Sequence, residues 1–234
     1  MTSLLAAEHV GALAVIAACA VAAVSSARRW PGLWVPIGCR ALAVVLVAAE
    51  LGWWTYLLSR GLRGFNIYDA LPLQLCDMTA FVAAFALWFR KPTLVELTYF
   101  WGLAGSTQAL LTPDLPHHFP TFLFFQYYVA HGGIVVAALV LAVGLRQAPR
   151  RSAVVTVALI TIADAALVGA IDALSGSNYM YLRFKPPSPT PLDVLGPWPW
   201  YLLPATLIGL ILFLVLDLPF RLRRDQPRPV LKRG

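Results

Sequence analysis

The chain has 234 residues, of which 59% are hydrophobic and 12% are charged, and its formal net charge is +7. A water-soluble fold of this composition would expose too much apolar surface, so an ordinary soluble protein is excluded. The composition favours a membrane protein whose positive charge meets anionic lipid headgroups rather than nucleic acid.

Seven apolar segments follow one another along the chain. Each is about 18–25 residues long, which is enough to cross a hydrocarbon core of ~30 Å as a helix. None alternates with a period of two, so barrel strands are not expected. The segments cover residues 9–26, 36–58, 71–89, 93–112, 120–144, 152–173 and 200–219. We predict an all-α, polytopic membrane protein with seven transmembrane helices, in which residues 1–219 form the membrane domain and residues 220–234 a basic cytoplasmic tail.

Basic residues predict the orientation of this bundle. Thirteen of the 18 Lys and Arg residues fall in alternate loops and the tail, and four fall on the opposite side. The positive-inside rule therefore places the C-terminus in the cytoplasm and the N-terminus outside. No Lys or Arg precedes the first apolar run, so that run is expected to be a retained anchor.

Polar side chains gather in the outer halves of five predicted helices. Such groups are costly in lipid and usually face the bundle interior. One interpretation is a set of interhelical hydrogen bonds, each worth about 0.6–2 kcal/mol. Structural bonds have no reason to favour one leaflet, however, so we predict a polar cavity that opens outward. The membrane-embedded candidates are Glu50, Gln74, Cys76, Asp77, Gln108, Gln126 and His131.

The third apolar segment carries the densest group of these residues. Pro72 suits a first helical turn, and Asp69 is positioned to cap it. Gln74 and Asp77 are three residues apart and should share one face, whereas Cys76 points about 100° away. Cys76 is either a nucleophile near a helix N-terminus or a small packing residue. Its position, like those of the other two cysteines, indicates neither a disulfide nor a metal site.

His131 is followed by Gly132 and Gly133, which permit a close helix approach or a kink. The imidazole is either a general base or a neutral group hydrogen-bonded to Asp77 or Glu50. Gln126 diverges from it by ~140° around the helix.

The last predicted external loop, residues 174–199, is rich in proline and ends in a Trp/Tyr cluster typical of a membrane interface. We predict that this loop is a lid, with Asn178, Tyr179 and Arg183 facing the cavity.

Five short runs in this chain resemble the YwaF-like family of bacterial integral membrane proteins. They are LPLQLC at 71–76, GSTQALLTP at 105–113, FFQYYVAHGG at 124–133, NYMYLRFKP at 178–186 and GPWPWY at 196–201. The resemblance implies a seven-helix protein of the bacterial plasma membrane.

The chain is also distantly similar to eukaryotic transmembrane proteins regarded as phospholipid acyltransferases with a cysteine nucleophile. Their Asn-Pro-Cys-His run would align with residues 71–74, so Leu73 stands at the cysteine position and Gln74 at the histidine position. Cys76 lies one turn further on and is a different position. His131 matches a histidine that follows a Tyr-Tyr pair in that family.

Three functional hypotheses follow. The first is an enzyme for acyl transfer or hydrolysis on phospholipid or acyl-chain substrates, with no cofactor. His131 would be its base, Asp77 or Glu50 the orienting partner, and Gln74 with Asn178 the donors to a carbonyl. The second is a protein that binds or transports a small amphipathic ligand, and the third is a membrane scaffold.

The remaining candidate binding residues are Cys76, Gln108, Gln126, Tyr179 and Arg183. Membrane lipids are the expected partners, and the oligomeric state is left open.

Overall fold

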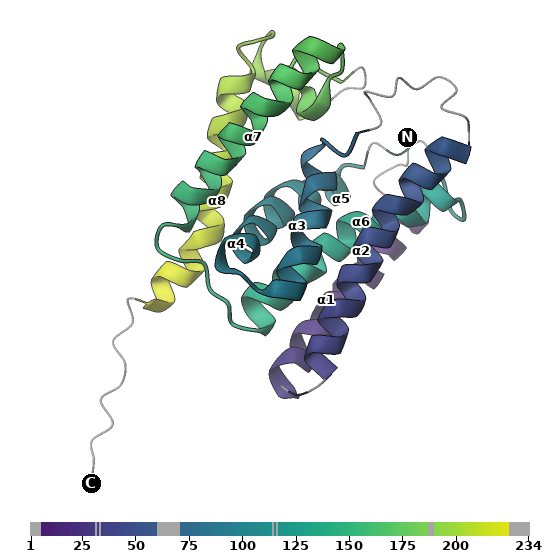
Figure 1. Ribbon diagram of the computed structural model, residues 1–234, viewed down its shortest axis with the longest axis vertical. Helices are drawn as coiled ribbons and strands as arrows, with labels where there is room; N and C mark the ends of the chain where they lie inside the picture. The colour runs from purple at the N-terminus through teal and green to yellow at the C-terminus, as the bar shows by residue number, and fades with distance from the viewer. Residues whose placement is uncertain are drawn as a thin grey trace.

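The computed structural model describes residues 6–30, 32, 34–59, 71–113, 115, 117–186 and 190–224, which fold into helices and contain no strand (Figure 1). The elements in chain order are α1 (Ala7–Arg29), α2 (Trp34–Ser59), α3 (Leu75–Phe89), α4 (Pro92–Trp101), the π-helix η2 (Gly102–Ser106), α5 (Thr107–Leu111), α6 (Phe122–Leu139), the π-helix η3 (Val140–Gly144), α7 (Ala153–Ser175), the 3-10 helices η4 (Tyr179–Tyr181) and η5 (Pro191–Leu195), and α8 (Leu202–Arg224). The all-α prediction is confirmed.

Five helical segments in these ranges are long and apolar enough to cross a membrane: α1, α2, α6 with η3, α7 and α8. Helix α3 has 15 residues, and the helix from Pro92 to Leu111 is interrupted by η2. The count of seven spans and the orientation therefore stay predictions. Helix α8 continues to Arg224 with Pro219 inside it, so the helix does not end at residue 219 as expected.

The start of α3 differs from the prediction. The helix begins at Leu75, and Gln74 precedes it in an extended conformation, so Pro72 is not in the first turn. The Leu73 N–H donates to the Leu71 carbonyl, which closes a tight turn around the proline. Asp69, the predicted cap, lies outside the described residues. Pro72 therefore lies in the turn that precedes α3 and is not the first residue of the helix.

Helix α3 lies in the middle of the bundle, where it packs against α2, α4 and α6. Its buried face consists mainly of small side chains, which let neighbouring helices approach closely: Ala80, Ala83, Ala84 and Ala86. Helices α7 and α8 run side by side at one edge of the molecule, and α1 and α2 lie at the other (Figure 1). We call the end of the bundle with Tyr179–Tyr181 the η4 end, and the opposite end, with the η3–α7 connection, the Arg150 end.

Two glycines of α6 allow the predicted close approach. A Cβ at Gly132 would lie 2.6 Å from the Ile16 side chain of α1, and one at Gly133 would lie 2.9 Å from Leu46 of α2. Because α6 is continuous from Phe122 to Leu139, the glycines serve packing and do not break the helix.

Candidate functional site

Polar groups from four segments lie in the bundle interior between the η4 end and its middle. We call Glu50, Cys76, Asp77, Ser106 and His131 the polar cluster. Glu50 of α2 is only 3% exposed, and Ser106 of η2 is fully buried. The Ser106 hydroxyl donates to the Cys76 sulfur at 4.0 Å. Asp77 is close enough to Glu50 and Cys76 to interact with both electrostatically. The structure therefore joins α2, α3 and η2 through one group of polar side chains.

His131 lies on α6 and is grouped with the cluster as the predicted base, although no described contact joins it to the other four residues. Its Nδ1 lies 2.9 Å from the Tyr127 carbonyl oxygen, and its ring packs against the Tyr127 ring with the centroids 4.3 Å apart. The Tyr127 hydroxyl donates to the Ala109 carbonyl of α5, so this face of α6 is turned toward α5 and η2. Since a carbonyl only accepts, Nδ1 must carry the proton, and Nε2 of the neutral ring keeps its lone pair.

The predicted hydrogen bond from His131 to Asp77 or Glu50 is absent among the described residues. The Tyr127 carbonyl, one turn earlier in α6, is the partner of the imidazole instead. The Asp77 carboxylate lies against the backbone N–H of Gln74, the residue before the helix, and so helps to cap α3. Local backbone groups thus satisfy both side chains.

Two residues of the predicted lid form hydrogen bonds with nearby backbone groups. The Asn178 amide oxygen accepts from the Arg183 and Phe184 backbone N–H groups, and its amide nitrogen donates to the Phe184 carbonyl. The Arg183 guanidinium donates to the carbonyls of Asp172 and Ser177. Both side chains therefore shape the turn after α7 and cap its last carbonyls. Their predicted role as residues that face the cavity stays a prediction.

Tyr179 and Gln74 connect that turn to the start of α3. The Tyr179 hydroxyl accepts the Leu71 N–H at 2.8 Å, and the Gln74 amide oxygen accepts the Met180 N–H at 2.9 Å. The Tyr179 N–H donates to the buried Asp172 carboxylate at 2.9 Å. The loop is therefore fastened over the N-terminal end of α3, and the amide oxygen of Gln74 is engaged in that contact.

The two other predicted glutamines are not members of the cluster by any described contact. Gln108 is exposed and lines a separate cavity of about 500 Å³, formed by η2 and α5 on one side and α7 and α8 on the other. Gln126 is half-buried on α6, five residues before His131. The outward-facing polar cavity predicted from the sequence therefore stays a prediction.

Ser106 is the functional candidate that sequence reasoning missed. A serine inside an apolar helix ordinarily bonds to its own backbone, so it attracts little notice. The π-helix η2 turns it toward α3. Its one available signal is its place in the run GSTQALLTP. Among the described residues, no group of three or more His, Cys, Asp or Glu side chains could hold a metal ion.

Comparison with protein-family models gives a match over most of the chain. Residues 4–217 match the model described as the TMEM164 family. A search of curated proteins found no match, and a search of solved structures found none.

Proposed function

We propose that this chain, which belongs to the TMEM164 family of integral membrane proteins, is a membrane enzyme that acts on phospholipid or acyl-chain substrates at the polar cluster. The observation that carries the proposal is the imidazole of His131. It is held by the Tyr127 carbonyl with Nε2 in the basic form, in a bundle whose polar cluster also includes the buried Glu50 and Ser106 and the half-buried Cys76 and Asp77. The distant resemblance to eukaryotic phospholipid acyltransferases supports the same substrate class.

The chemistry of the cluster suits transfer of an acyl group. His131 Nε2 takes the proton of a water or lipid hydroxyl, whose oxygen attacks the ester carbonyl of a phospholipid. The proton then passes to the departing lysophospholipid oxygen, so that the base is regenerated. General base catalysis of this kind contributes ~10²–10⁴-fold. Ser106 supplies a hydroxyl that can donate to the developing oxyanion.

Cys76 is a poor candidate for an acyl-enzyme nucleophile. A reactive thiolate needs an adjacent cation or base. The described neighbours of its sulfur are the Ser106 hydroxyl and the carboxyl groups of Asp77 and Glu50. We therefore propose direct transfer to the acceptor hydroxyl, with Cys76 as a packing residue.

Acyl exchange between phospholipids in nanodiscs tests this function. Replacing His131 by Gln should lower the exchange rate by ~10²–10⁴-fold, because the amide cannot transfer a proton near neutral pH. Cys76→Ser should keep the rate within about tenfold of the parent if the thiol is not the nucleophile. His117→Gln is the matched control, since it changes a histidine outside the cluster.

The outcomes separate the hypotheses. If His131→Gln exchanges acyl groups as fast as the parent, His131 has no part in the mechanism. If Cys76→Ser alone loses the exchange activity, the thiol is the nucleophile and the reaction passes through an acyl-enzyme. If the parent shows no acyl exchange, the enzyme hypothesis is contradicted.

The separate cavity beside Gln108 supports a second candidate, the binding of a small amphipathic ligand. Its walls are apolar apart from Gln108 and the hydroxyls of Thr161, Thr206 and Tyr201. Mass spectrometry of the purified protein should then reveal a bound ligand that Gln108→Leu loses. A parent without exchange and without bound ligand would leave the scaffold hypothesis.

A further inference from the structure

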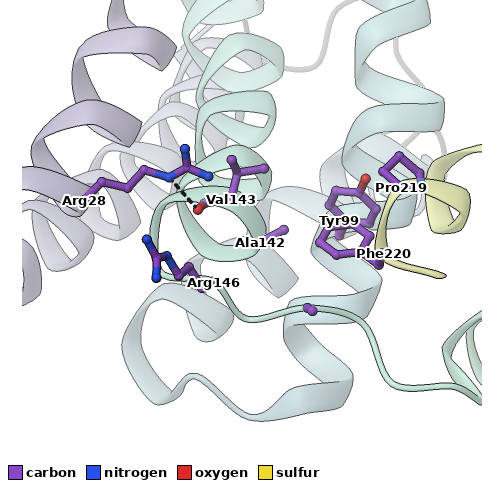
Figure 2. A pocket seen from close by; sticks show the side chains of 8 residues that line it. Arg28, Tyr99, Ala142, Val143, Arg146, Pro219 and Phe220 are labelled. Carbon is purple, nitrogen blue, oxygen red and sulfur yellow. Dashed lines mark hydrogen bonds between the residues drawn. The ribbon is translucent and has the colours of Figure 1, made fainter. Parts of the chain in front are cut away.

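A cavity with charged side chains lies at the Arg150 end, away from the polar cluster. It has a volume of about 630 Å³ and is formed where α1, α4, η3 and α8 meet. Figure 2 shows Arg28, near the end of α1, and Arg146, after η3, along one side; Tyr99, Pro219 and Phe220 lie across from them. The cavity therefore has one cationic wall and one mostly apolar wall.

The two arginines differ from Arg150 and Arg221, the two ion-paired arginines at this end. Arg150 pairs with Glu96 at 2.7 Å, and Arg221 pairs with Asp217 at 2.5 Å. In the part of the chain that the structure describes, neither Arg28 nor Arg146 forms an ion pair. Two guanidinium groups without acidic partners in one cavity indicate a place for an anion.

The contacts of Arg28 leave most of its donors available. Its Nε donates to the Val143 carbonyl at 3.2 Å, which fixes the plane of the guanidinium against η3. The two terminal nitrogens make no described hydrogen bond. They form the edge that binds a phosphate in a forked geometry.

Arg146 is held at the cavity by an unusual backbone. Its φ is 56°, in the left-handed region, two residues after the π-helix that ends at Gly144. The Gln147 N–H donates to the Leu141 carbonyl and closes this turn.

The rest of the cavity favours an amphipathic occupant. Ala142, Val143 and Phe220 contribute apolar surface, and the Tyr99 hydroxyl is engaged with the Leu216 carbonyl at 3.0 Å. The nearby Asp217 carboxylate is ion-paired with Arg221, so its charge is offset. A free inorganic anion would leave this apolar surface uncovered.

We propose that Arg28 and Arg146 bind the phosphate of an anionic phospholipid headgroup, whose glycerol and first acyl carbons lie against Ala142 and Phe220. Basic cavities between membrane helices commonly hold such headgroups on the cytoplasmic side, which is the predicted side of this end. The site is separate from the polar cluster and does not depend on the proposed enzyme activity.

Lipid retention tests the site. The protein is reconstituted in nanodiscs of phosphatidylcholine mixed with phosphatidylglycerol, extracted, and analysed by native mass spectrometry. The parent should retain phosphatidylglycerol in preference to phosphatidylcholine. The variant Arg28→Gln with Arg146→Gln should lose about tenfold of this preference, the scale of one charge-assisted hydrogen bond. Arg29→Gln with Arg151→Gln is the matched control, because it removes the same charge from exposed positions outside the cavity.

Three results would overturn the proposal. The first is an unchanged preference in the Arg28/Arg146 variant, and the second is an equally large loss of preference in the Arg29/Arg151 control. The third is that inorganic phosphate protects the detergent-solubilised parent against thermal unfolding as well as phosphatidylglycerol does. The single variant Arg146→Gln controls for misfolding of the double variant, because the Arg146 side chain makes no described hydrogen bond that the substitution would remove. It should still lose several-fold of the preference while melting like the parent in phosphatidylcholine.

Discussion

Arg150 surrounds the carboxylate of Glu96 with three hydrogen bonds. Its backbone N–H and its Nε donate to one carboxylate oxygen at 2.7 and 2.9 Å, and one terminal nitrogen donates to the other at 2.7 Å. The Glu96 side chain is 2% exposed and that of Arg150 is 48% exposed. These bonds raise the pKa of the Arg150 guanidinium, which therefore stays charged. The pair fastens the η3–α7 connection to the first turns of α4.

The unequal exposure of this pair predicts unequal effects of mutation. Arg150→Gln leaves a buried carboxylate without its ionic partner and should lower the free energy of unfolding by about 3 kcal/mol. Glu96→Gln should cost less, on the order of 1 kcal/mol, because water can solvate the exposed arginine. Thermal unfolding in detergent measures both, with Arg151→Gln as the neighbouring control. A larger loss for Glu96→Gln than for Arg150→Gln would contradict this account.

The glycine contacts of α6 give a second prediction. Gly132→Ala places a methyl group 2.6 Å from Ile16, so α1 must shift, and we expect a loss of about 1–3 kcal/mol in stability. Gly38→Ala is the control, because no atom lies within 4 Å of a Cβ at that position in α2. It should be neutral or stabilising by up to about 1 kcal/mol. Equal melting temperatures for the two variants would show that α1 is not tightly packed on Gly132.

The loop over the start of α3 gives a third prediction. Asp172→Ala removes the acceptor of the Tyr179 N–H, whereas Asp172→Asn keeps an oxygen at that position. We expect Ala to cost about 1–3 kcal/mol and to speed hydrogen exchange in residues 177–184. Asn should exchange nearly as slowly as the parent. Unchanged exchange in the Ala variant would mean that the other contacts of the loop suffice to hold it.

The helices were predictable because lipid imposes their length and apolar composition. The segment predicted at 36–58 is helical from Trp34 to Ser59, and the one predicted at 152–173 from Ala153 to Ser175. A spanning helix must bury its backbone groups over ~30 Å, so its pattern is strong in any single sequence. Seven long apolar runs therefore located the helical segments to within a few residues.

The details of the site were less predictable because they depend on distant or local backbone contacts. The start of α3 is held by Tyr179 and Met180, more than 100 positions away in the chain. Asn178 and Arg183 bond to nearby backbone groups, which a polar pattern cannot distinguish from facing a cavity. Ser106 is oriented by a π-helix, for which the residues themselves carry little signal.

Orientation is the last prediction, and both proposed sites depend on it. Single cysteines at His117 and Ala148 are introduced into a parent whose native Cys19, Cys39 and Cys76 are replaced by Ala. His117 lies in the α5–α6 connection at the η4 end, and Ala148 is exposed in the η3–α7 connection at the Arg150 end. Since basic residues gather at the Arg150 end, a membrane-impermeant maleimide should label His117→Cys in intact cells and Ala148→Cys only after lysis. Labelling of Ala148→Cys from outside would show that the orientation is the reverse of the predicted one. The arginine cavity would then lie in the outer leaflet, away from the anionic cytoplasmic surface.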